Sequence, residues 1–292
     1  MRYLTRKEID VDKYDACIAN SSQTRVYAFS WYLDIVADNW SVLVLNDYEA
    51  VMPLPYRKKY FITYVYPPFW LLELGAFSVI NDVDTKVFLK AIFQKFRFVE
   101  LRMNTQNHFQ GLNSFSVEKQ LQHLSLDEGY MTLSSKYQKD RKKDLRRAVK
   151  ADLVERWDDH PENLIRLFRA NVGLRTKNIK EKDYTVLHKL MTICIEKKIG
   201  EVLSVYNTKN EIVASGFFLK HQKTVTILVS ATDFKNRKNG ANTFLIDRAM
   251  YKFQHNFDGF NFGGSSIHSV AKFFKSFGAT NESYFLLRKR LL

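Results

Sequence analysis

The same order of secondary-structure elements is predicted twice along this chain, and that repeat constrains the fold more than any other feature. Each copy begins with three short apolar stretches separated by polar turns, which is typical of antiparallel strands. An amphipathic helix and a further strand follow in each copy. The ranges are 41–46, 49–56, 60–69, 84–96 and 97–103 in the first copy, and 201–207, 211–221, 224–231, 240–254 and 258–262 in the second. The copies share little sequence, so the repeat predicts two domains of similar layout.

Four more helices are expected outside the repeated elements. They cover residues 135–150, 161–172, 181–198 and about 267–277, and Pro161 is well placed to open the second of them. The pattern as a whole predicts an α+β protein with mixed, mostly antiparallel sheets flanked by helices. A chain of 292 residues is long enough for two domains that each bury a core. We place the domains at 1–130 and 131–292.

Composition and charge narrow the class of protein. A hydrophobic content of 46% with 14% aromatic residues excludes a disordered chain. The net charge of +14 indicates anionic partners, such as the phosphates of a cofactor, nucleic acid or a membrane surface. No window approaches the roughly 20 apolar residues of a membrane-spanning helix. Cys17 and Cys194 have neither metal-ligand spacing nor the pattern of a disulfide framework. We therefore expect a cytoplasmic protein, with peripheral contact at the inner face of the membrane as a further expectation.

The helix predicted over 135–150 carries the densest run of positive charge in the chain. Its basic residues are Lys136, Lys139, Arg141, Lys142, Lys143, Arg146, Arg147 and Lys150. An apolar stripe of Leu133, Tyr137, Leu145 and Ala148 runs along it at helical spacing and is interrupted by Arg141. Ser134 or Ser135 is the predicted N-cap. This pattern indicates a basic helix that lies on the protein with one face toward solvent.

The segment 232–242, TDFKNRKNGAN, is the first candidate binding site because it joins a predicted strand to a predicted helix. Basic residues, among them Arg237 and Lys238, surround the turn, and Gly240 stands at the start of the helix. A helix N-terminus offers unpaired N–H groups and the positive end of a dipole, which suit a phosphate. The alternative interpretation is a basic, solvent-exposed loop in which Gly240 is a turn residue.

The segment 261–279, NFGGSSIHSVAKFFKSFGA, is the second candidate. Gly263 and Gly264 allow the backbone to approach a ligand closely, and Ser265 or Ser266 is the predicted N-cap of the following helix. On that helix Ile267, Val270, Ala271, Phe274 and Phe277 share a core face, and His268, Lys272 and Lys275 share a neighbouring face. A lysine on this second face would stabilise the oxyanion that develops when an amine attacks an ester or thioester carbonyl. A solvated face is the alternative.

These two segments resemble motifs of the GNAT N-acyltransferases and, most specifically, of the Fem-type enzymes, which have two tandem GNAT-like domains. The run Arg237-Lys238-Asn239-Gly240-Ala241-Asn242 resembles the loop that cradles the CoA pyrophosphate in GNAT proteins, with Asn242 in place of a smaller residue. The runs Asn261-Phe262-Gly263-Gly264 and Phe274-Lys275-Ser276-Phe277-Gly278 resemble the Fem carboxy-terminal signature, with Asn261 where that family prefers an acid. The basic helix resembles the one that opens the second Fem domain.

The resemblance implies transfer of an acyl or aminoacyl group to an amine. It implies acyl-CoA, such as acetyl-CoA, or aminoacyl-tRNA as donor, an amine such as that of a cell-wall precursor as acceptor, and no metal. The donor would contact Arg237, Lys238, Asn239, Gly240 and Asn242. Lys275 would act on the carbonyl, with Asp233 and His268 as candidate proton acceptors. Substrate contacts are expected from Asn261, Gly263, Gly264, Ser265 and Ser266, with Arg175 and Lys177 as further anion contacts on a loop between helices.

The first domain is expected to differ in function from the second. Its strand-to-helix turn, 78–86, is acidic and contains no glycine, so it is not expected to bind CoA phosphates. The turn at 56–60, YRKKY, places three cations at a hairpin tip that would meet an anionic acceptor or a lipid head group, although basic hairpin turns also serve solubility. A noncatalytic RNA- or membrane-surface-binding protein with the same fold is the alternative function.

Overall fold

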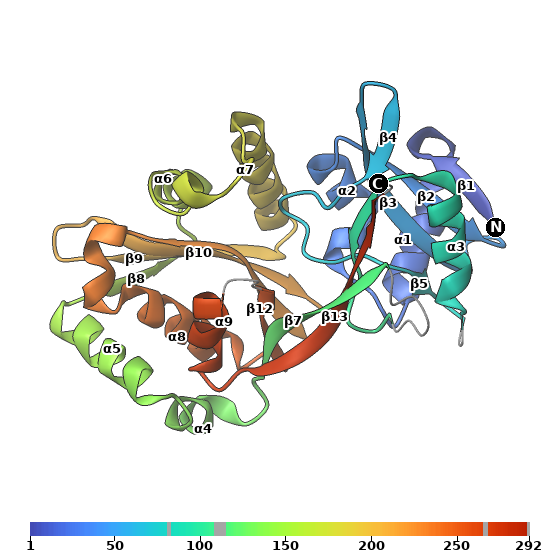
Figure 1. The fold of residues 1–292 in the computed structure, drawn as a ribbon. Helices are drawn as coiled ribbons and strands as arrows, with labels where there is room; N and C mark the ends of the chain where they lie inside the picture. The colour runs from blue at the N-terminus through green and yellow to red at the C-terminus, as the bar shows by residue number, and fades with distance from the viewer. Residues whose placement is uncertain (81–82, 108–114, 265–267, 291–292) are drawn as a thin grey trace. The chain divides into compact units, whose positions relative to one another are not determined.

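A computed structural model describes residues 1–80, 83–107, 115–264 and 268–290 (Figure 1). The chain divides into two compact units. Unit 1 consists of Met1–Gln120 and Ser283–Leu292, and unit 2 consists of Leu121–Glu282. Two strands, β7 (Ser116–Ser125) and β13 (Thr280–Lys289), have residues in both units. No helix in the described part of the chain is long and apolar enough to cross a membrane.

Unit 1 is built on a sheet with the strand order β1-β2-β3-β4-β6-β13, and β5 pairs with β3. Its other elements are β1 (Arg2–Thr5), α1 (Val11–Asn20), α2 (Ser30–Val36), β2 (Asn39–Leu45), β3 (Ala50–Lys59), β4 (Ile62–Val65), β5 (Phe77–Ser78), α3 (Thr85–Lys95) and β6 (Val99–Arg102). Neighbouring strands are antiparallel except β4 and β6, which are parallel at Val65 and Val99. Tyr14, Tyr32 and Phe88 are fully buried in this unit and form part of its core.

Unit 2 has the strand order β7-β12-β11-β10-β9-β8. Its elements are α4 (Gly129–Ser135), α5 (Lys139–Lys150), β8 (Val154–Trp157), α6 (Pro161–Ala170), α7 (Glu181–Glu196), β9 (Gly200–Tyr206), β10 (Ile212–His221), β11 (Thr224–Thr232), α8 (Ala241–Phe253), β12 (Gly259–Gly264) and α9 (His268–Lys275). Only β11 and β12 are parallel; the other neighbours are antiparallel. The core of this unit combines aliphatic and aromatic side chains, and Phe218, Phe260 and Phe277 are completely buried in it.

The repeated layout is confirmed, and so is the α+β class with mostly antiparallel strands. The first copy is β2-β3-β4-α3-β6 and the second is β9-β10-β11-α8-β12. In both copies the third strand continues through a helix into a strand that lies parallel to it. Such a crossover brings the carboxyl ends of the two parallel strands to the same edge of the sheet.

The basic helix differs from the prediction because the chain forms two helices there. Ser134 and Ser135 end α4, and the N-cap of α5 is Gln138, so the predicted serine cap is wrong. The break is fixed by Tyr137, whose ring is buried against Phe277 at 5.2 Å, and by the backbone N–H of Gln138, which donates to Ser276 O at 2.9 Å. Packing between these residues outweighs the helical propensity of a continuous basic segment.

Two other expectations are resolved by the described residues. The strand expected over 60–69 ends at Val65, before Pro67 and Pro68, which cannot donate to a strand ladder. Cys17 and Cys194 are buried and are not joined in a disulfide. Burial raises the pKa of the Cys17 thiol to about 11 and that of Cys194 to about 12, so both stay protonated at neutral pH.

Candidate functional site

The strands β11 and β12 separate after a short paired segment, and their separation makes room for a site. They pair only from Thr224 with Gly259 to Thr226 with Asn261, whereas β11 continues to Thr232. A bulge in β11 lies just beyond the paired segment, because Phe217 pairs with Val229 and Phe218 with Ile227. Bulges bend a strand and leave one residue out of the ladder. The end of β11 therefore remains paired with β10 but no longer with β12 as it leads toward the start of α8.

A cavity of about 680 Å³ lies at this edge, and all of its lining residues belong to unit 2. We call it the arginine cavity, after Arg141, Arg175 and Arg237, which line it. Its other walls come from α5, residues 172–176, the end of β11, the turn before α8 with the first turn of that helix, and α9. Val270, Phe273 and Phe274 of α9 make one wall apolar. The cavity therefore combines positive charge with an apolar surface.

Phe234 holds two of the three arginines. The guanidinium carbon of Arg237 lies 3.6 Å from the centre of the Phe234 ring, and that of Arg175 lies 4.3 Å from it. Both arginine side chains are otherwise exposed. A ring that stacks with a guanidinium fixes its plane and leaves its N–H groups available to an anion. These two arginines are thus oriented at the mouth of the cavity, ready to contact a phosphate or carboxylate.

Arg141 is the buried cation of the site. Its side chain is only 12% exposed, and its guanidinium carbon lies 4.5 Å from the centre of the Phe273 ring. It forms an ion pair of 3.0 Å with Asp144 and donates a hydrogen bond to the hydroxyl of Thr243. Burial lowers the pKa of Arg141 from its usual value, and Asp144 opposes that shift by attraction. The Nε of Arg141 is buried and has no hydrogen-bond partner among the described residues.

Thr243 and Asp144 connect α5 to the first turn of α8. The Thr243 hydroxyl accepts the hydrogen bond from Arg141 and donates to a carboxylate oxygen of Asp144 at 3.1 Å. Asp144 also pairs with Arg147 at 3.0 Å. The carboxylate is thus shared by two arginines and a hydroxyl, so it positions Arg141 and leaves the cavity with an excess of positive charge.

Gly240 is required by the close approach of α5. Its φ is +82°, and a Cβ there would lie 2.1 Å from the backbone oxygen of Asp144. The side chain of Asn239 accepts a hydrogen bond of 2.9 Å from the N–H of Ala241, the first residue of α8. The next N–H groups, of Asn242 and Thr243, belong to the first turn and have no partner within an α-helix. Their residues line the arginine cavity.

The structure brings together four of the residues proposed from sequence: Arg175, Arg237, Gly240 and Asn242 all line the arginine cavity. Lys177 and Lys238 are exposed and are not among the lining residues. Asp233 accepts a hydrogen bond from the N–H of Lys235 at 2.9 Å and lines a different cavity, beside Asn171.

The second segment proposed from sequence contributes through other side chains. His268 and Lys275 are the first and last residues of α9, and both are exposed outside the lining of the arginine cavity. Asn261 accepts a hydrogen bond of 2.7 Å from the N–H of Gly263, whose φ is +70°. Gly264 pairs with Leu121 in the sheet. Ser265 and Ser266 lie outside the described residues.

Sequence reasoning missed Arg141, Asp144, Thr243, Ser269 and Phe273, which all line the cavity. One signal for Arg141 is visible in the sequence, since it interrupts the apolar stripe around Tyr137, Leu145 and Ala148. A cation within the apolar stripe of a helix is expected to face the interior of the protein, where its charge needs a partner. The other four have no comparable signal. The described residues contain no group of three or more His, Cys, Asp or Glu able to hold a metal ion.

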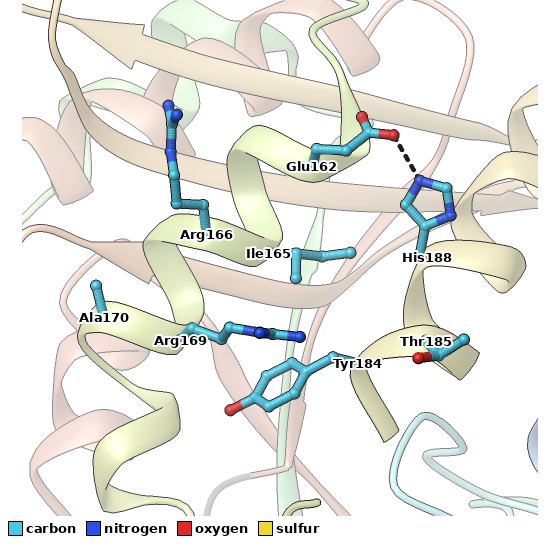
Figure 2. Close-up of a pocket in the computed structure, with 8 residues that line it drawn as sticks. All are labelled: Glu162, Ile165, Arg166, Arg169, Ala170, Tyr184, Thr185 and His188. Carbon is cyan, nitrogen blue, oxygen red and sulfur yellow. Dashed lines mark hydrogen bonds and ion pairs between the residues drawn. The ribbon is translucent and has the colours of Figure 1, made fainter. Parts of the chain in front are cut away.

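A second cavity in unit 2, of about 600 Å³, lies between α6 and α7 (Figure 2). Figure 2 shows Glu162 of α6 reaching His188 of α7, at 2.6 Å, and Arg169 directed toward Tyr184. The guanidinium carbon of Arg169 lies 4.5 Å from the centre of the Tyr184 ring, and Arg169 also pairs with Glu181. Arg169 is already paired with a carboxylate of the protein, and Glu162 adds a negative charge to the lining, so the α6–α7 cavity is less suited to an anionic ligand than the arginine cavity is.

Comparison with known proteins places this geometry in a known fold. No protein-family model and no curated protein sequence matches the chain. Among solved structures, FemX covers 98% of this chain and 97% of its own at 10% identity, with a TM-score of 0.66. The C-terminal domain of a putative lysylphosphatidylglycerol synthetase from Agrobacterium fabrum covers 97% and 92% at 12% identity, with a TM-score of 0.59.

A tandem GNAT protein from the clavulanic acid biosynthesis pathway is similar over the same extent. It covers 98% of this chain and 97% of its own at 8% identity, with a TM-score of 0.56. All three similarities extend over nearly the full chain and so include both copies of the repeated layout. The protein therefore has the Fem-like, tandem-GNAT fold.

Proposed function

We propose that this protein transfers an acyl or aminoacyl group from an ester or thioester donor to an amine. The observation that carries the proposal is the arginine cavity, where three guanidinium groups meet an apolar wall beside the N-terminus of α8. Acyl-CoA and aminoacyl-tRNA both join a reactive acyl group to a carrier rich in phosphate. Phosphate suits the arginines and the helix N-terminus, and the acyl group suits the wall formed by Phe273 and Phe274.

In the proposed reaction the amine nitrogen attacks the carbonyl carbon of the donor and forms a C–N bond. The C–S or C–O bond to the carrier then breaks, and the proton lost by the amine ends on the leaving thiolate or alkoxide. Cations near the carbonyl stabilise the oxyanion that develops. Arg141 is the proposed cation on geometry, and Lys275 is the one proposed on sequence.

The candidate proton acceptors differ in their position relative to the arginine cavity. Asp233 and His268 are the candidates from sequence, and they lie outside the lining of the arginine cavity. Asp144 is in the lining but is held by Arg141 and Arg147, so we assign it a positioning role. Transfer of the amine proton to the leaving group, directly or through water, needs no protein base at the cavity. On this proposal positioning contributes more than acid–base catalysis.

The proposal is tested by incubating the protein with acetyl-CoA, longer acyl-CoAs or aminoacyl-tRNA and a simple amine acceptor. Release of free CoA thiol or of uncharged tRNA identifies the donor, and the melting temperature measures its binding. Arg237→Ala is expected to weaken donor binding, whereas Arg146→Ala, an exposed arginine on α5, serves as the matched control. Absence of transfer and of stabilisation with every donor would contradict the proposal.

Noncatalytic RNA binding is the second candidate, and the exposed face of α5 favours it. Lys139, Lys142, Lys143, Arg146 and Lys150 are all exposed there. Such a surface would bind RNA with steep dependence on salt and without dependence on the aminoacyl group. Retention of uncharged tRNA that is lost in Arg146→Ala but not in Arg237→Ala, without any transfer, would favour this candidate.

A further inference from the structure

The hairpin of β3 and β4 extends past the sheet of unit 1. The strand β2 pairs with β3 only as far as Tyr56, and β4 pairs with β6 only at Val65. Between these positions the described strands pair only with each other, from Arg57 with Tyr64 to Lys59 with Ile62. Figure 1 shows this hairpin projecting beyond the other elements of its unit. It is a two-stranded ribbon whose tip, residues 58–62, is exposed.

The apex of the hairpin is apolar and aromatic. Tyr60 is 88% exposed, Phe61 is 105% exposed and Ile62 is 44% exposed. Single exposed apolar residues are ordinary, but three consecutive ones at a projecting tip form a surface that suits a partner. These three side chains are not packed in the core of the protein, so packing does not explain why they are apolar.

The conformation of the turn makes the choice of residues more unusual. Tyr60 is the first residue of the two-residue turn, and its φ is +53°. Glycine, asparagine and aspartate are the residues that hairpin turns ordinarily place there, because they tolerate positive φ. An aromatic residue in this conformation is unfavourable for folding alone, which indicates that its side chain serves another purpose.

Two lysines beside the apex supply charge. Lys58 and Lys59 are exposed, and the described residues provide neither with a carboxylate partner. The Nζ of Lys59 lies 5.8 Å from the centre of the Tyr60 ring. Arg57, by contrast, pairs with Asp38 and stacks on Tyr66 at 3.9 Å, so it anchors the base of the hairpin to the sheet. The tip therefore presents an apolar apex with two unpaired positive charges behind it.

We propose that this hairpin tip, residues 58–62, docks the protein on a lipid bilayer that contains anionic phospholipid. Phe61 and Ile62 enter the boundary between head groups and acyl chains, Tyr60 lies at the head-group level, and Lys58 and Lys59 meet the phosphates. Aromatic and apolar side chains together with lysine are the composition that binds such a surface. This inference goes beyond the proposed acyl transfer and does not depend on it.

The same features argue against other partners. Lysine is depleted in protein–protein interfaces, whereas long basic side chains are favoured at membrane surfaces. Single-stranded RNA binds in grooves where aromatic rings stack with successive bases. Here the aromatic residues stand at a convex apex, which enters a deformable bilayer more readily than it lines a groove. One such tip gives weak and reversible binding, so the contact is peripheral.

The test is flotation of the full chain with vesicles of phosphatidylcholine alone and with vesicles that also contain phosphatidylglycerol. We expect binding only to the anionic vesicles. Phe61→Ser should lower the partition coefficient about tenfold, and Lys58→Ser and Lys59→Ser should each lower it about fivefold. High salt should remove the lysine contribution and leave that of Phe61. Met131→Ser, at an apolar residue that is 81% exposed in unit 2, and Lys209→Ser, at another hairpin turn, are the matched controls.

Insertion is measured separately with Phe61→Trp, whose fluorescence should shift to the blue and be quenched by brominated lipid, unlike that of Met131→Trp. Equal binding to neutral and anionic vesicles, or binding unchanged in the Phe61 and lysine variants, overturns the proposal. So does a hairpin that retains RNA instead of lipid, or a Phe61→Ser variant whose lipid-free oligomeric state changes. Transfer to a soluble amine should be unaffected by these variants, so the docking can fail without affecting the proposed reaction.

Discussion

The guanidinium of Arg141, on α5, lies over the ring of Phe273, on α9, with 4.5 Å between the guanidinium carbon and the ring centre. The contact places a buried cation against the apolar wall of the arginine cavity. Arg141→Ala is expected to reduce donor binding or transfer at least about tenfold, because it removes a charge-assisted donor from a partly desolvated site. Initial rates across donor concentrations measure the effect.

The control for this prediction is Arg146→Ala on the exposed face of the same helix. It removes an equal charge without touching the cavity, so its effect on binding should be small and should vanish at high salt. Arg141→Lys should recover the charge but not the stacked, planar geometry, and we expect only partial recovery. Equal losses in Arg141→Ala and Arg146→Ala would contradict the assigned role of Arg141.

Thr243 is expected to position Arg141. Thr243→Val keeps the shape of the side chain but removes the hydroxyl that bridges Arg141 and Asp144, which leaves Arg141 with its ion pair to Asp144 alone. We expect a loss of about 1–3 kcal/mol in the free energy of unfolding. The loss of kcat should be larger than in variants elsewhere in the protein that lose the same stability. Thr243→Ser keeps the hydroxyl and should restore activity. Denaturant unfolding and steady-state kinetics measure the two effects, and a serine variant as impaired as the valine one would exclude the hydroxyl.

Gly240 is expected to be essential for folding. Gly240→Ala places a methyl group 2.1 Å from a backbone oxygen of α5, at a residue whose φ is +82°. We expect a loss of about 3 kcal/mol in the free energy of unfolding, because backbone atoms must move. Gly129→Ala is the matched control, since Gly129 also has a positive φ of +74° but its nearest neighbour would lie 3.8 Å away. That control should lose only about 1 kcal/mol, and equal losses would mean that φ alone matters.

Gly240 also illustrates how much of the site could be predicted from the sequence. Periodicity and turn residues were sufficient to predict the two repeated copies. The position of the turn before α8 was sufficient to predict that Arg237, Gly240 and Asn242 belong to the site. The reason why glycine is required was not visible in the sequence, because it depends on Asp144, which lies far earlier in the chain. Contacts between distant elements depend on tertiary packing, and local patterns do not encode them.

The basic helix illustrates the same limit in another way. Residues 135–150 contain seven other basic residues besides Arg141. In the sequence Arg141 therefore looks like one more solvent-exposed charge. Only the fold distinguishes it, since Phe273 and Thr243 come from helices that follow much later in the chain. Conversely, Lys275 matches a motif but is exposed. Motifs locate a segment, whereas packing decides which of its side chains reach the cavity.

The variant Lys275→Ala distinguishes between Arg141 and Lys275, the two cations proposed to stabilise the oxyanion. Lys275 ends α9 and is exposed outside the lining of the arginine cavity, so the geometry predicts that kcat changes less than about twofold. Lys272→Ala, one turn earlier on the exposed face, is the control. A loss of kcat well beyond that in Arg141→Ala, with donor binding intact, would instead support the assignment made from the motif.

Acid should destabilise unit 2 through Glu201, whose carboxylate pairs with Lys220 at 2.6 Å and also with Lys252. Burial raises the pKa of this carboxyl, but its hydrogen bonds and the charges of the two lysines lower it more, so its pKa lies below the usual value. A carboxyl with a lowered folded-state pKa stabilises the protein above its unfolded pKa, and this stabilisation is lost as pH falls through the folded-state pKa. Glu201→Gln should therefore lower stability at neutral pH and flatten its decline below about pH 4.5, as measured by urea unfolding across pH. Glu181→Gln, which removes an exposed ion pair with Arg169, should change neither, and an unaltered decline in Glu201→Gln would exclude this carboxylate as the cause.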